Sequence, residues 1–178
     1  PLNAMKRQPY PAAFFFGAIE SAGFSFLPLW GERSGLSPSA AAPLLTFGGL
    51  GHVACQIPLG MLADRVNKPR LIFGCALVGA FGTLAAISLS ANTAWLYFGL
   101  FCWGGVVGGI YTVGLAYVSQ MFAGEKLAAA NSAFILNYAA GMLIGPPLTG
   151  ALFEQIGPNG FIYAIAGMSG LYALIVGA

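Results

Sequence analysis

Six long apolar segments, separated by short polar stretches, dominate the pattern of hydrophobic and polar positions. Each is near or above the ~20 residues that an α-helix needs to cross the hydrocarbon core of a bilayer. The predicted helices cover residues 10–30, 39–63, 71–91, 94–122, 127–153 and 160–178. Proline falls in or near several of these runs, which membrane helices tolerate when neighbouring helices satisfy the freed carbonyl groups. The pattern therefore predicts an all-α membrane protein with six transmembrane helices.

The composition supports the same class. Hydrophobic residues make up 58% of the 178 positions and charged residues only 7%, against roughly 25% charged residues in a soluble domain. The net charge of +2 leaves no basic patch large enough for nucleic acid. The three cysteines lie inside apolar runs, where we expect small buried side chains rather than a disulfide or a metal site. We expect a lipid bilayer as partner, and no nucleic acid, metal or cofactor.

Basic residues mark one side of the predicted membrane domain. That side carries Lys6, Arg7, Arg65, Lys68, Arg70 and Lys126. The opposite side carries Arg33 alone, next to Glu32. Because cytoplasmic loops are enriched in Lys and Arg, six basic residues against one indicate that both termini are cytoplasmic. The membrane would be a plasma membrane or a bacterial inner membrane.

A weak internal repeat relates the two halves of the chain. Gly60-x-Leu62-x-Asp64-x-Val66 aligns without gaps with Gly150-x-Leu152-x-Glu154-x-Ile156, 90 residues later. This offset equals three predicted helices, and an odd number inverts the second copy in the membrane. The sequence therefore predicts an inverted repeat of residues 1–91 and 92–178, which is how half of one large transporter class is built.

The loop between the second and third predicted helices resembles the signature of the major facilitator superfamily. Its matching residues are Gly60, Leu62, Ala63, Asp64 and Arg65, followed by Lys68 and Arg70; Asn67 stands where the family usually has glycine, and Pro69 where it usually has a basic residue. This degenerate end is typical of the second half of such transporters, and residues 97–105 lack the arginine that many first halves carry. The resemblance implies the C-terminal six-helix half of a twelve-helix transporter, with the N-terminal half as its partner.

A second motif lies in the fifth predicted helix. Gly141-x-x-x-Gly145-Pro146-Pro147-x-x-Gly150 is similar to the glycine–proline motif of drug–proton antiporters, which the family carries in the fifth helix of its first half. We expect Gly141, Gly145 and Pro146 to thin and bend this helix and to permit sliding against a neighbour. Because the motif stands here in the second half, it supports an antiporter only weakly.

The charged loop has two interpretations. Asp64 could pair with Arg65 or Arg70, or accept hydrogen bonds from backbone N–H groups near Lys126, and so latch the cytoplasmic side in one state. Breaking that contact would permit the two halves to rock. Alternatively, these charges, with Lys68, only set the orientation in the membrane.

Glu20 is the sharpest single signal in the sequence. It lies near the middle of the first predicted helix, where a charged carboxylate costs at least ~2.5 kcal/mol on insertion scales. Glu20 could therefore bind a proton or a cation as part of transport. The alternative is a protonated side chain that hydrogen-bonds a neighbouring helix and has no functional role.

Other polar side chains at similar depth are candidates for the substrate or proton path. His52 has Gln56 one turn later, and imidazole suits proton relay because it titrates near neutral pH; a neutral histidine bonded to a neighbour is an equal alternative. Tyr111 lies mid-depth in the fourth helix, which lines the cavity in the resembled family, as does the first. Asn131 and Tyr138 lie seven residues apart on one helical face, where interhelical hydrogen bonds also explain them.

These observations predict secondary active transport of a small solute by alternating access, coupled to protons through Glu20. Uptake and efflux stay open, as do the substrate and the oligomeric state. The alternative is a self-contained six-helix channel or scaffold that dimerises. An enzyme is not expected, because no set of catalytic residues is evident.

Overall fold

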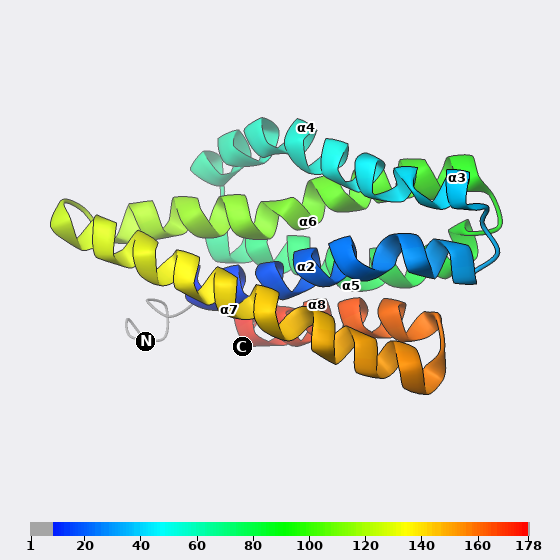
Figure 1. Ribbon diagram of the computed structural model, residues 1–178. Coiled ribbons are helices and arrows are strands. Elements are labelled where there is room, and N and C mark those ends of the chain that lie inside the picture. Colours follow the sequence, from blue (N-terminus) through cyan, green and yellow to red (C-terminus); the bar gives the residue numbers. More distant parts are fainter. Residues whose placement is uncertain (1–8, 178) are drawn as a thin grey trace.

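The computed structural model describes residues 9–177, which form α-helices joined by short connections (Figure 1). The helices are α2 (Pro9–Arg33), α3 (Pro38–Ala41), α4 (Pro43–Arg65), α5 (Lys68–Leu89), α6 (Thr93–Met121), α7 (Glu125–Ile156) and α8 (Asn159–Gly177). The six predicted segments are confirmed to within a few residues. The second one begins as the separate short helix α3, which continues after Ala42 into α4.

Local sequence explains where the helices begin and end. Asn67 and Asn92 precede α5 and α6, and their side chains accept hydrogen bonds from the first free backbone N–H groups: Arg70 N at 3.1 Å, and Ala94 N at 3.0 Å. After the last residue of α7, Gly157 has a φ of 79°, a value that glycine adopts easily because it lacks a Cβ. The chain can therefore turn sharply there into α8.

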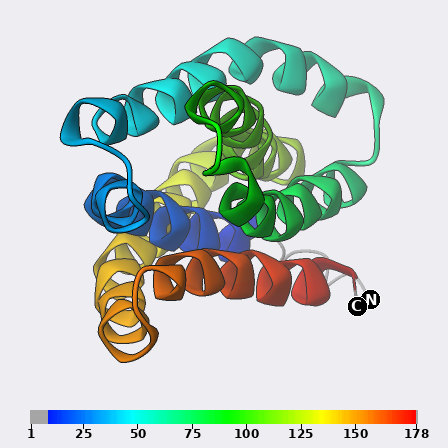
Figure 2. The same cartoon turned by 90° about the vertical axis from the view of Figure 1, so that its right-hand side faces the viewer.

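Within residues 9–177, six helices, counting α3 and α4 as one span, are long and apolar enough to cross a membrane. Their connections alternate between the two ends of the bundle. The α4–α5 and α6–α7 connections lie at the end where α2 begins and α8 finishes (Figure 1). Figure 2 looks onto the opposite end, with the α2–α3, α5–α6 and α7–α8 connections toward the viewer. Arg65, Lys68, Arg70 and Lys126 therefore share one end, whereas Glu32 and Arg33 lie at the other. Lys6 and Arg7 lie outside the described residues.

The helices pair in a pattern that agrees with an inverted repeat. The most extensive contacts join α4 to α6, α2 to α7, and α5 to α8. Exchanging α2, α4 and α5 for α6, α7 and α8 converts the α4–α6 pair into the α7–α2 pair, and the α5–α6 pair into the α8–α2 pair. The six helices thus form half of the two-half transporter fold that the sequence predicts, whereas the division at residues 91 and 92 stays a prediction.

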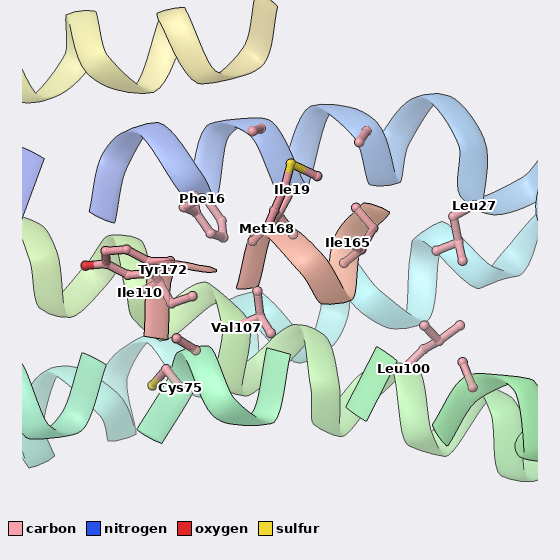
Figure 3. Close-up of a cluster of buried hydrophobic side chains, with 14 of the residues drawn as sticks. Phe16, Ile19, Leu27, Cys75, Leu100, Val107, Ile110, Ile165, Met168 and Tyr172 are labelled. Atoms are coloured by element: carbon pink, nitrogen blue, oxygen red, sulfur yellow. The ribbon is translucent and has the colours of Figure 1, made fainter. Parts of the chain in front are cut away.

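The core lies where α2, α5, α6 and α8 meet. Ile19, Ile110, Ile165 and Tyr172 are at most 1% exposed there (Figure 3). In contrast, α4 and α7 carry exposed apolar side chains along their lengths, such as Val53, Ile57, Leu136 and Leu143. Such exposure suits helices that face lipid or a further part of the protein.

Candidate functional site

Glu20 of α2 and Tyr138 of α7 form the polar centre of the candidate site. The Tyr138 hydroxyl donates a hydrogen bond to Oε2 of Glu20. One residue later on α2, the Ser21 hydroxyl donates to the Met142 carbonyl oxygen at 3.1 Å. Both bonds join the middle of α2 to the middle of α7, so the helix pair is tied at the depth of the carboxylate.

Small residues allow these two helices to approach closely. A Cβ placed on Gly141 would lie 1.9 Å from the Phe14 carbonyl oxygen, and one on Gly145 would lie 2.2 Å from that of Ala18. From the other side, a Cβ on Gly17 would lie 2.3 Å from the Tyr138 carbonyl oxygen. Any side chain at these positions would force the backbones apart. The close approach brings the Tyr138 ring against α2, within reach of Glu20.

The glycine–proline motif therefore has a packing role in this structure. Gly141 and Gly145 are buried against α2, and Gly150 faces the Phe26 ring. Pro146 lies inside α7, which remains one helix from Glu125 to Ile156. Whether the motif also permits sliding stays a prediction.

Aromatic rings surround the Glu20–Tyr138 bond. The Tyr138 and Tyr111 rings lie edge to face, with centroids 5.5 Å apart. Phe16, one turn before Glu20, packs against Tyr111 at 5.6 Å and against His52 at 5.5 Å. Residues from α2, α4, α6 and α7 thus meet around Phe16, and four of the sequence-predicted candidates belong to this one cluster.

A pocket opens beside this cluster between α2, α4 and α6. Glu20 and His52 both line it, so the two titratable residues face the same space from different helices. Phe16, Phe24 and Trp103 contribute aromatic walls, and most of the remaining lining is aliphatic or glycine. Among the described residues, no Lys or Arg lines this pocket. We name it the Glu20 pocket.

His52 is held by its neighbours on α4 and α6. Its Nε2 lies 3.4 Å from Nε2 of Gln56, one turn further along α4. On the α6 side, a Cβ on Gly108 would lie 2.1 Å from the imidazole ring, so only glycine leaves room for this histidine. Gln56 is exposed and does not line the pocket.

Asn131 is the one candidate that the structure places apart. It lies nearly two turns before Tyr138 on α7 and does not line the Glu20 pocket. Its Oδ1 is buried without a hydrogen-bond partner among the described residues. A role in the substrate path remains a prediction for this residue.

The charged loop between α4 and α5, at the end of the bundle where α2 begins, is exposed. Asp64 and Arg65 end α4 at its surface, and within residues 9–177 Asp64 makes no salt bridge. Asn67, which departs from the usual glycine, caps α5 through its bond to the Arg70 N–H. The structure therefore gives the loop a helix-capping function, and the latch formed by Asp64 stays a prediction, as do the gating roles of Gly60, Lys68 and Arg70.

Three aromatic residues of the pocket are not among the candidates predicted from the sequence. They are Phe16, Phe24 and Trp103. Helical spacing offered a signal, because Phe16, Glu20 and Phe24 are four residues apart and share one face of α2.

Comparison with known proteins gives the chain a family. The sequence model described as Major Facilitator Superfamily matches residues 10–178. Relatives named "Uncharacterized MFS-type transporter YcaD", from Escherichia coli O139:H28 and from strain K12, are 27% identical over 164 residues. The match covers 90% of this chain and 41% of each relative, so the chain spans about two fifths of their length. No solved structure matches.

Proposed function

Because this chain belongs to the major facilitator superfamily, we propose that it is one six-helix half of a secondary transporter that moves a small solute by alternating access. The six apolar helices and the family make it a multi-pass integral membrane protein. The family is one of transporters rather than of enzymes. The complete transporter would enclose the substrate path between this half and an N-terminal one. The end with Arg65, Lys68, Arg70 and Lys126 would face the cytoplasm of a plasma or inner membrane.

Proton coupling through Glu20 is the mechanistic core of the proposal. The observation that supports it is a single carboxyl group that both lines an apolar pocket and accepts a hydrogen bond from a neighbouring helix. In its charged form the carboxylate is a strong acceptor for the Tyr138 hydroxyl. In its protonated form it has lost that charge, so the bond between α2 and α7 weakens.

This change links protonation to helix packing. The charged form is costly in an apolar pocket unless a partner or a cation compensates it. Protonation removes this cost when the pocket is empty, and a bound cationic or hydrogen-bonding solute would favour release of the proton. His52, across the pocket, could pass the proton on.

The test is transport by the complete protein in liposomes loaded with a pH-sensitive dye. A sugar, an amino acid, an organic anion and a quaternary ammonium ion would be added in turn. At least one of them is expected to evoke proton flux with wild type and not with Glu20→Gln. Glu32→Gln is the matched control, since Glu32 is an exposed carboxylate on the same helix. Uptake without proton flux, or equal flux in Glu20→Gln, would contradict the coupling role.

A further inference from the structure

A second pocket adjoins the Glu20 pocket. It lies between α2, α5, α6 and α8, and its lining is apolar except for Thr83. Gly23, Leu27 and Trp103 line both pockets. Figure 3 shows Leu27 of α2 and Leu100 of α6 pointing toward each other, with Ile165 of α8 beside them; all three line the second pocket. We name this space the tail pocket.

At the junction between the two pockets, α2 leaves free space, whereas α6 contributes a side chain that is held in place by α5. A Cβ placed on Gly23 would meet no atom within 4 Å, so α2 leaves free space at this point. Trp103 forms the opposite wall, and its indole Nε1 donates to the Gly79 carbonyl oxygen at 3.1 Å. The indole also packs on Gly82, where a Cβ would lie 2.8 Å from its ring.

The chemistry of the two spaces differs. The Glu20 pocket offers one carboxylate and three aromatic side chains, and both kinds of group can attract a cation in an apolar setting. Its other titratable member is His52, and Tyr138, which does not line the pocket, donates a hydrogen bond to Glu20. Among residues 9–177, the lining holds no Lys or Arg, and His52 is the one group in it that could carry a positive charge. The tail pocket offers only hydrophobic burial, worth roughly fourfold in affinity per buried methylene.

From this arrangement we propose that the transported solute is an elongated amphiphilic monocation. Its charged head lies at Glu20 between Phe16 and Trp103, and its apolar tail passes Gly23 into the tail pocket. This substrate class rests on the proposed transport function and adds a second subsite to it.

The experiment uses alkyltrimethylammonium ions with one, six, eight or ten carbons in the variable chain. Binding to the complete protein in lipid nanodiscs is measured below micelle-forming concentrations, with empty nanodiscs as the baseline for partition into lipid. Affinity above that baseline is expected to rise at least tenfold from the one-carbon to the ten-carbon ion. Glu20→Gln is expected to weaken binding of every ion in the series at least tenfold.

Gly23→Leu tests the tail pocket because a Cβ at this position meets no atom within 4 Å and the rest of the side chain would occupy the junction. It is expected to abolish the rise in affinity with chain length. Gly167→Leu is the matched control: Gly167 is exposed on α8, has equally free space, and lines neither pocket. Leu27→Ala enlarges the shared space and is expected to shift the preferred chain to a longer one. It provides a second readout if Gly23→Leu does not fold.

The outcomes separate this inference from the transport proposal. Chain-length dependence that persists unchanged in Gly23→Leu, or in Leu27→Ala when Gly23→Leu is not folded, overturns the tail pocket. If none of the ammonium ions binds, while another class of solute evokes proton flux that depends on Glu20, the substrate class is wrong and the proposed function stands. If the ions bind as expected but neither they nor any other solute evokes proton flux, the subsites are supported and the coupling is wrong.

Discussion

The Tyr138 hydroxyl donates a hydrogen bond to the Glu20 carboxylate, although the two residues are 118 positions apart in the chain. Tyr138 belongs to α7 and Glu20 to α2, and the bond lies where glycines on both helices let the backbones touch. The carboxylate also lines the Glu20 pocket, so the same group contacts the pocket and joins the two helices.

Replacement of Tyr138 by Phe should destabilise the protein, because it removes the hydrogen bond from the Tyr138 hydroxyl on α7 to the Glu20 carboxylate on α2. A hydrogen bond to a charged group contributes about 1.5–3 kcal/mol. Thermal unfolding in detergent should therefore show a lower midpoint for Tyr138→Phe. An unchanged midpoint would show that this bond does not help to hold the two helices together.

Replacement of Gly141 by Ala should destabilise the protein. The added methyl group would overlap the Phe14 carbonyl oxygen, and forced separation of packed helices costs about 1–3 kcal/mol. Gly74→Ala is the control, because a Cβ there meets nothing within 4 Å. Thermal unfolding in detergent should show a lower midpoint for Gly141→Ala only. Equal midpoints would mean that the α2–α7 contact is looser than described.

Replacement of Asn67 by Ala should remove the N-terminal cap of α5. The expected loss is about 1 kcal/mol, because the Arg70 N–H loses its acceptor. Asn67→Asp should keep most of the stability, since an aspartate side chain caps equally well. The same thermal measurement distinguishes them. If Asn67→Ala and Asn67→Asp were equally stable, the cap would contribute nothing.

Orientation in the membrane can be tested with single cysteines in a cysteine-free protein. A cysteine at position 68 should react with an impermeant thiol reagent only in inside-out vesicles, and one at position 35 only in intact cells. The physical reason is the cluster of Arg65, Lys68, Arg70 and Lys126 at one end of the bundle. Labelling in the opposite pattern would reverse the proposed topology.

Much of the fold follows from the sequence because the bilayer imposes one rule on every segment. A run long enough to span must be a helix, so the hydrophobic pattern alone predicts six helices and the sharing of ends by charged loops. The intramembrane Glu20 stands out for the same reason, since a charge at that depth is costly.

The partners of Glu20 could not be predicted in the same way. Which face of α2 meets which face of α7 depends on how glycines fit against backbone carbonyls of another helix, as Gly17 does against Tyr138. Apolar residues occur on every face of these helices, so the hydrophobic pattern alone does not single out the side that forms a pocket. Only the spacing of Phe16, Glu20 and Phe24 marks one face of α2. The sequence alone therefore does not distinguish Trp103 and Phe16 from ordinary core residues.

The most direct measurement is proton release from the purified complete protein in weakly buffered detergent solution when a transported solute is added. Wild type and Glu32→Gln should acidify the solution to the same extent, and Glu20→Gln should not acidify it. Equal acidification by Glu20→Gln would contradict the assignment of the coupled proton to this carboxyl group.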